Sequence, residues 1–125
     1  MLAFDEMTLV VNDLTAALEF YGALLGFEVI GRDDRNNQEA AYLTLGKFRL
    51  KLVRPPSKRT LPPPNAITLT FLTDSFEQIQ QNLQGKVDVV ENKPTTWTHG
   101  RTLVMRDPAG YTISIVENSK GRADA

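Results

Sequence analysis

The sequence predicts an α+β fold in which two tandem β-α-β-β-β units form curled mixed sheets around a cup-shaped cavity. The same order of strand-like and helix-like segments occurs twice, with Thr8 corresponding to Thr68 and Gly26 to Gly85 at an offset of about sixty residues. A proline-rich segment separates the two copies. We therefore expect a single domain over 1–125, with unit one at about 5–53, a linker at 54–65, unit two at about 66–117 and a tail at 118–125.

The first copy begins with a strand and a capped helix. Met7–Val11 is apolar and rich in β-branched residues, which is typical of a strand. Asn12 and Asp13 then offer N-cap side chains for a helix over Leu14–Leu25, whose apolar residues recur at helical spacing. Gly26 is expected to end this helix, because glycine adopts the left-handed C-cap conformation without a steric cost.

Three more strands are expected to complete the first unit. Phe27–Arg32 returns to strand character, and the polar segment Asp33–Gln38 predicts a turn. Ala41–Leu45 and Phe48–Val53 are then expected to pair as a hairpin about Gly46-Lys47.

The second copy follows a linker over Arg54–Asn65, whose two proline clusters favour extended, semi-rigid backbone. A strand over Ile67–Phe71 precedes a helix over Ser75–Gln84, with Thr73 or Asp74 as its cap. The elements expected after this helix are a stop at Gly85, strands over Lys86–Val90, Thr102–Arg106 and Tyr111–Glu117, and a turn over Asp107-Pro108-Ala109-Gly110.

The composition restricts the classes of function. The net charge is −1, which lacks the basic excess of nucleic-acid-binding proteins. There is no cysteine, so disulfides, thiolate zinc sites and thiol catalysis are excluded. The N-terminal residues carry no positive signal-peptide region, and no apolar run approaches the roughly 18 residues of a membrane span. We therefore expect a cytoplasmic protein that binds neither nucleic acid nor membranes.

Strand alternation assigns a face to each side chain, because successive residues of a strand point to opposite sides. Apolar residues such as Leu9, Leu50 and Leu69 are expected to face the helices. The other face then carries Glu6, Thr8, Val10, Arg49, Lys51, Val53, Ala66, Thr68, Thr70, Thr112, Ser114 and Val116. This mixture of small polar and apolar side chains is typical of a ligand pocket. The alternative is a weakly polar sheet face that a partner chain covers.

Two groups of residues resemble the signatures of a known family. The first group is Asn12-Asp13-Leu14, Phe20-Tyr21 and Leu25-Gly26-Phe27; the second is Gly100-Arg101 with Arg106–Tyr111. With the repeated β-α-β-β-β order, they resemble the vicinal oxygen chelate superfamily over residues 4–117. This superfamily includes glyoxalase I, extradiol dioxygenases, fosfomycin-resistance transferases and bleomycin-binding proteins. The resemblance implies the fold and identifies no reaction.

The resemblance also implies a way of pairing. Small members of the superfamily are commonly homodimers in which each cavity is built from both chains. It therefore implies a homodimer that binds a small molecule. The linker is equally compatible with pairing of the two units within one chain.

The metal-dependent members of the superfamily bind one divalent ion through four strand positions. Carried over to this sequence, those positions are Glu6, Lys51, Ala66 and Ser114. Only Glu6 is a good ligand, because Lys51 would repel the ion, Ala66 has no donor and Ser114 is a weak neutral donor. We therefore expect no metal and no cofactor. We expect Glu6 and Lys51 to form an ion pair in the space of the metal; the alternative is that both reach solvent at the rim.

Several further residues are candidates for ligand contact. Trp97, the only tryptophan, is either a stacking platform or a lid over the core, and His99 is either a ligand contact or an exposed loop residue. Arg49 either binds an anionic group or pairs with Asp5, Glu6 or a partner chain. Tyr42 is expected to reach the cup. The remaining members of the predicted ligand-binding set are Lys51, Thr68, Thr70 and Ser114.

Two functions follow from these residues. The first is metal-independent binding of an aromatic or apolar small molecule, with Trp97, Tyr42 and the threonines as contacts. The alternative is a glyoxalase-like lyase or isomerase, with or without a divalent metal, in which Glu6 is the general base and Lys51 or Arg49 stabilises an enolate. In a third, structural interpretation the cup is filled by its own side chains.

Overall fold

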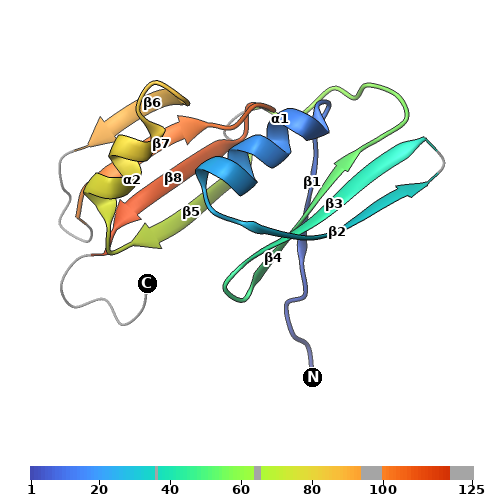
Figure 1. The fold of residues 1–125 in the computed structure, drawn as a ribbon, viewed down its shortest axis with the longest axis horizontal. Coiled ribbons are helices and arrows are strands. Elements are labelled where there is room, and N and C mark those ends of the chain that lie inside the picture. The colour runs from blue at the N-terminus through green and yellow to red at the C-terminus, as the bar shows by residue number, and fades with distance from the viewer. Residues whose placement is uncertain (36, 64–65, 94–99, 119–125) are drawn as a thin grey trace. The chain divides into compact units, whose positions relative to one another are not determined.

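The β-α-β-β-β order occurs twice in the computed structural model, which describes residues 1–35, 37–63, 66–93 and 100–118 (Figure 1). The chain divides into two compact units, Met1–Leu61 and Pro62–Ala125. Each unit contains one four-stranded mixed sheet and one helical segment. The predicted α+β fold of two tandem units is therefore confirmed, whereas a cup shared by both sheets stays a prediction.

The sheet of unit one is built from β1 (Met7–Val10), β2 (Glu28–Arg35), β3 (Gln38–Leu45) and β4 (Phe48–Arg54). The strand order is β1-β4-β3-β2, with β1 parallel to β4 and the other pairs antiparallel. Its core includes four leucines that are at most 1% exposed, namely Leu9, Leu43, Leu50 and Leu52. The helical segment packs against β3 and β4 on this leucine face, as the alternation predicted.

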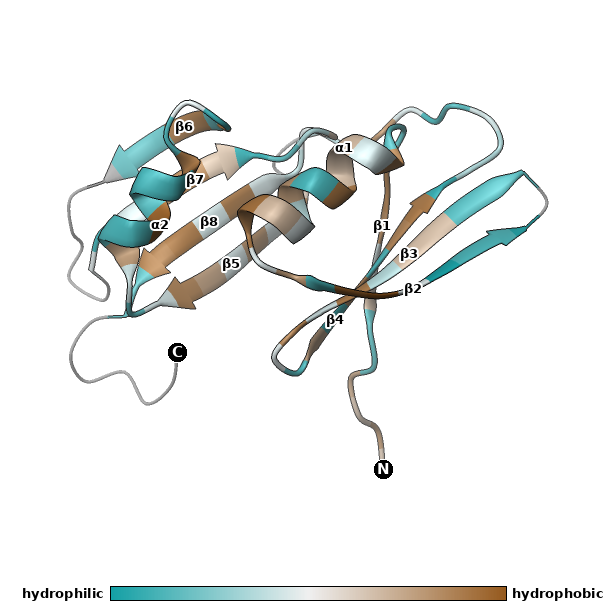
Figure 2. Cartoon of the chain, in the orientation of Figure 1, coloured by the Kyte–Doolittle hydropathy of each residue, from teal (hydrophilic) through white to brown (hydrophobic). Residues whose placement is uncertain are grey.

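The hairpin of β2 and β3 is longer than predicted. A turn was expected over Asp33–Gln38, but strand pairing continues to Arg35 opposite Gln38. Asn37 adopts a left-handed φ of 62°, a conformation that asparagine tolerates better than most residues. The error arose because these residues are hydrophilic, as Figure 2 shows for the far ends of both strands. Ladder hydrogen bonds and local ion pairs maintain strand structure here without an apolar face.

The first helical segment is an α-helix that becomes a π-helix. α1 (Leu14–Leu18) is capped by Asp13, whose Oδ1 accepts a 3.0 Å hydrogen bond from the Ala16 amide. It continues as the π-helix η1 (Glu19–Leu24), where a regular α-helix was expected. The wider turn rotates the following residues, so Phe20 is buried in the core while Leu24 and Leu25 are half-buried.

The start of the linker is bound to unit one. Asn12 does not cap the helix but makes two hydrogen bonds with the backbone of Arg59, of 2.9 and 3.0 Å. Pro55 is buried, and Pro56 follows it on the surface. Because the first unit extends to Leu61, the residues after β4 belong to unit one rather than to a free spacer.

Unit two repeats the arrangement with β5 (Thr68–Thr73), α2 (Phe76–Leu83), β6 (Asp88–Lys93), β7 (Thr102–Arg106) and β8 (Thr112–Glu117). The strand order is β5-β8-β7-β6, which matches unit one position for position. The N-cap of α2 is Ser75, not Thr73 or Asp74 as predicted. Thr73 still contributes, because its hydroxyl accepts a 2.9 Å hydrogen bond from the Ser75 amide.

The turn between β7 and β8 is organised by Asp107. Its carboxylate accepts hydrogen bonds from the amides of Ala109 and Tyr111, at 2.9 and 2.8 Å. Its carbonyl accepts a third from Gly110, whose φ of 95° requires glycine. The predicted Asp-Pro-Ala-Gly turn is therefore confirmed in its residues and in its hydrogen bonds. Within the described part of the chain, no helix is long and apolar enough to cross a bilayer.

Candidate functional site

The face of the first sheet opposite the leucine core carries polar side chains from all four strands, and we call it the open face of unit one. Thr8, Lys51, Tyr42 and Gly31 lie directly opposite one another across β1, β4, β3 and β2. The alternation argument had placed Thr8, Lys51 and Tyr42 on this face. The strand register therefore agrees with the sequence prediction.

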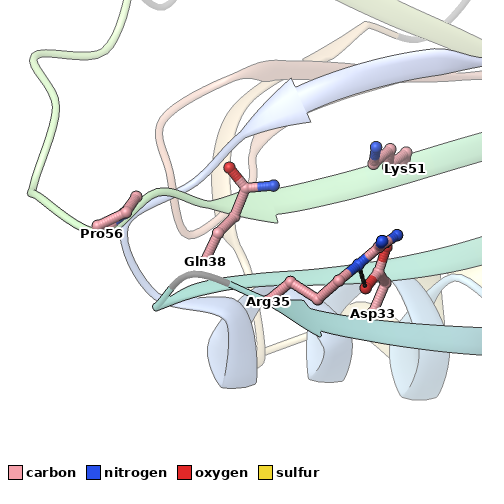
Figure 3. A pocket seen from close by; sticks show the side chains of 5 residues that line it. All are labelled: Asp33, Arg35, Gln38, Lys51 and Pro56. Carbon is pink, nitrogen blue, oxygen red and sulfur yellow. Dashed lines mark hydrogen bonds and ion pairs between the residues drawn. The ribbon is translucent and has the colours of Figure 1, made fainter.

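A cavity of about 360 Å³ lies on this face toward the far end of the β2–β3 hairpin. Figure 3 shows the side chains that line it, which are Asp33, Arg35, Gln38, Lys51 and Pro56. They come from β2, β3, β4 and the segment that follows β4. The volume is within the range of about 300–1,000 Å³ that small-molecule sites occupy. A more open hollow of about 470 Å³ adjoins it, sharing Gln38 and Pro56.

Asp33 and Arg35 form a bidentate pair on the cavity wall. Arg35 Nε and Nη2 each donate a 2.7 Å hydrogen bond to one carboxylate oxygen of Asp33. These bonds lower the pKa of Asp33 below its ordinary value and raise that of Arg35; the positive charge of Lys51 lowers the Asp33 pKa further. Both oxygens of Asp33 are therefore engaged by Arg35.

Lys51 has a different partner from the one predicted. An ion pair with Glu6 was expected, but the described residues contain none between these two side chains, and Glu6 precedes β1. The register explains the difference, because Lys51 is opposite Thr8 and two positions from Glu6. Its ammonium lies instead 5.3 Å from the centre of the Tyr42 ring.

Arg49 follows one of its predicted alternatives. Its guanidinium is 3.4 Å from the carboxylate of Asp5, and both side chains are well exposed. An exposed ion pair of this kind contributes about 1 kcal/mol or less. Arg49 does not line the cavity.

In unit two, the predicted residues lie on the equivalent face but in a different setting. Thr68 and Thr70 on the edge strand β5 are exposed, whereas Ser114 on β8 is 9% exposed. The residue opposite Thr68 is Thr112, in the place that Lys51 occupies opposite Thr8. Thr112 accepts a 3.1 Å hydrogen bond from Arg106. Within this unit, the cavity of about 310 Å³ is lined by residues of α2, β6 and β7 and by none of the predicted site residues.

Trp97 and His99 lie outside the described residues, so their predicted roles stay predictions. The Gly100-Arg101 signature that follows them has a structural explanation. A Cβ on Gly100 would lie 2.7 Å from the Cβ of Glu117, and Arg101 bonds the Glu117 carboxylate at 2.9 Å. This motif therefore fixes the start of β7 against the end of β8.

The sequence reasoning missed Asp33, Arg35 and Gln38 as site residues. The sequence predicts a turn over all three residues, and residues of a turn are not assigned to either face of a sheet. The signal that could have found them is the alternation itself. Continued through β2 and β3, it places these three residues on the same face as Tyr42 and Lys51.

The residues at the superfamily's metal positions do not fit a divalent ion. Glu6 and Lys51 belong to unit one and Ala66 and Ser114 to unit two, and only Glu6 supplies a carboxylate. Within the described ranges, no three His, Asp or Glu side chains are grouped to hold a metal. An ammonium at the second position opposes a cation at the distances of coordination. We derive no step through a metal for this chain.

The β-α-β-β-β order is present in each of the two units, as the resemblance to the vicinal oxygen chelate superfamily implied. A family model of the Glyoxalase/Bleomycin resistance protein/Dioxygenase superfamily matches residues 3–115. The chain belongs to this superfamily. A search of curated proteins returns no match.

Solved structures share the fold at low sequence identity. SMU.1112c is 23% identical with a TM-score of 0.75, covering 94% of this chain and 99% of that one. A variant of the fosfomycin resistance protein FosX from Listeria monocytogenes, in complex with Mn(II) and 1S,2S-dihydroxypropylphosphonic acid, is 13% identical with a TM-score of 0.79, covering 93% and 92%. A glyoxylase/bleomycin resistance protein/dioxygenase domain from Frankia sp. EAN1pec is 17% identical with a TM-score of 0.78, covering 98% and 96%. These likenesses concern the fold.

Proposed function

We propose that this protein binds a small organic molecule on the open face of unit one and that binding needs no metal. The observation that carries the proposal is the cavity of about 360 Å³ formed around Lys51. A sheet face that only closed a core would be filled by apolar side chains. This one carries polar and charged groups around a hollow of ligand size.

Metal independence is supported by the donor set. The superfamily position nearest the cavity carries the ammonium of Lys51, which takes the place of a carboxylate and also opposes a cation. The FosX structure, which contains Mn(II), is therefore a guide to the fold here and not to the chemistry. The cavity wall is more polar than an aromatic or apolar ligand alone requires, so we expect a ligand with at least one polar group.

We test the proposal by ligand-observed NMR with a library of metabolite-sized compounds, in the presence of EDTA. Hits should shift backbone amides of β2, β3 and β4 and should bind equally well with and without the chelator. Gln38→Trp should abolish binding because it fills the cavity, whereas Thr44→Trp, on the same strand and face but outside the cavity, should not. Binding that requires added metal, or hits that ignore Gln38→Trp, would refute the proposal.

We further propose that the chain forms a homodimer. Exposed apolar residues support this, since Val29, Ile30, Val89 and Val90 on β2 and β6 are 46–50% exposed. Val29 and Ile30 lie on β2, and Val89 and Val90 lie on β6. In each of these edge strands the pairing register shifts at this point. Analytical ultracentrifugation should give twice the mass of the 14.0 kDa chain, and a monomer at all concentrations would contradict the proposal. A cytoplasmic location stays a prediction from the sequence.

A further inference from the structure

The charges around the cavity of unit one are unbalanced, and this imbalance identifies a ligand class. The lining residues carry one negative charge, on Asp33, and two positive charges, on Arg35 and Lys51. Arg35 and Asp33 neutralise each other through their two hydrogen bonds. Lys51 has no carboxylate within ion-pair distance among the residues that the structure describes. One positive charge therefore faces the cavity without a counter-charge.

Three hydrogen-bond donors are available around this charge. Among the residues that the structure describes, the Lys51 ammonium contacts the ring of Tyr42 and no carboxylate, which leaves its N–H groups for a ligand. The Gln38 amide makes no side-chain hydrogen bond with another described residue. Arg35 uses Nε and Nη2 for Asp33, so Nη1 remains a donor. Figure 3 shows Gln38, Arg35 and Lys51 standing on the same side of the sheet.

The bidentate pair also restricts what can bind. Because both oxygens of Asp33 are engaged by Arg35, the cavity offers no free carboxylate to a cationic ligand. The acceptors on the described lining side chains are the Gln38 carbonyl and the remaining lone pairs of Asp33, whose charge Arg35 neutralises. Donors and positive charge thus outnumber acceptors and negative charge, which favours anions over cations and over neutral molecules.

We propose that the cavity of unit one binds ligands through an anionic oxygen group, a carboxylate or a phosphonate, that the Lys51 ammonium holds beside the Arg35–Asp33 pair. This inference rests on the proposed function, because it names the ligand class of the same site. Lys51 supplies the charge and Gln38 a second donor. Asp33 holds the Arg35 guanidinium in place through two hydrogen bonds.

The experiment compares benzoate, phenylphosphonate and the neutral benzamide with the full chain in EDTA, by NMR titration. Hydrogen bonds to charged groups predict that benzoate or phenylphosphonate binds at least about tenfold more tightly than benzamide. Lys51→Met should remove about tenfold of the anion affinity and leave benzamide unchanged. Lys47→Met, the same substitution in the exposed β3–β4 turn, is the matched control and should have no effect. The two anions distinguish a carboxylate ligand from a phosphonate ligand.

The outcomes separate this inference from the proposed function. If neutral compounds bind on β2–β4 as tightly as the anions, the anion inference is wrong and the binding function survives. If Lys47→Met loses as much anion affinity as Lys51→Met, the effect is one of general charge, and the anion inference is wrong as well. If no compound of any class binds on this face, the proposed function itself fails. If Lys51→Met does not fold, two other measurements decide whether the cavity prefers anions. They are the anion affinity of Lys51→Arg and the ratio of the benzoate affinity to the benzamide affinity in the unaltered protein.

Discussion

The side chain of Asp107 is expected to stabilise unit two through the hydrogen bonds that it accepts from the amides of Ala109 and Tyr111. Asp107 is 5% exposed and Tyr111 is 2% exposed, so the amide of Tyr111 cannot turn to water when the carboxylate is removed. An unpaired buried donor costs about 1–3 kcal/mol. The amide of Ala109 is half-buried and can be hydrated, so its lost bond costs about 1 kcal/mol or less. Asp107→Ala should therefore lower the free energy of unfolding by about 1–4 kcal/mol.

Asp107→Asn is the matched control for this prediction. Its side-chain oxygen can still accept from both amides, so these two bonds lose only their charge assistance. We expect a cost of about 1 kcal/mol or less for this variant. Urea denaturation at pH 7, followed by circular dichroism, measures both variants. The reasoning is refuted if Asp107→Ala costs less than 1 kcal/mol or if Asp107→Asn costs as much.

Two further predictions concern charges. The pKa of Glu117 is lowered, first by hydrogen bonds from the Arg101 side chain and then by one from the Arg101 backbone. The pair therefore stabilises the fold at pH values above the ordinary glutamate pKa. This contribution is lost as the pH falls through the lowered pKa. Glu117→Gln should thus lower the Tm at pH 7 and lower it less at pH 3; a difference that grows on acidification contradicts this. Lys51→Glu, which places a second carboxylate at one of the superfamily's metal positions, should create weak affinity for Mn²⁺, Ni²⁺ or Zn²⁺ in calorimetry; no rise over Lys51→Met would mean that the metal positions were carried over wrongly.

The fold could be predicted because its determinants are local. The cap at Asp13, the left-handed glycines at 26 and 85 and the Asp107 turn each depend on residues within a few positions, and all are present in the structure. The π-helix over Glu19–Leu24 could not be predicted in this way. A π-helix and an α-helix can have the same amino-acid composition, so composition does not distinguish them. The difference here lies in how Phe20 and Tyr21 pack in the core.

The site was less predictable because it depends on pairing across strands. Alternation placed Lys51 and Tyr42 on one face, but their contact follows from the register, which no single strand contains. The register also explains why the expected ion pair between Glu6 and Lys51 is absent among the described residues. Lys51 lies opposite Thr8, which is two residues after Glu6. Polar strands such as the end of β2 are the hardest case, because no apolar periodicity distinguishes them from turns.

The two units diverge on the face that the core does not constrain. Leu9 and Leu69 hold equivalent core positions and remain leucine, because any change of volume there is costly. The positions opposite Thr8 and Thr68 are Lys51 and Thr112, an ammonium in one unit and a hydroxyl that accepts from Arg106 in the other. The hydroxyl is buried and satisfied within its own sheet, whereas the ammonium faces a cavity without a counter-charge among the described residues. This difference between the repeats is the reason that the proposed ligand site lies in unit one, where Lys51 supplies a positive charge beside the cavity.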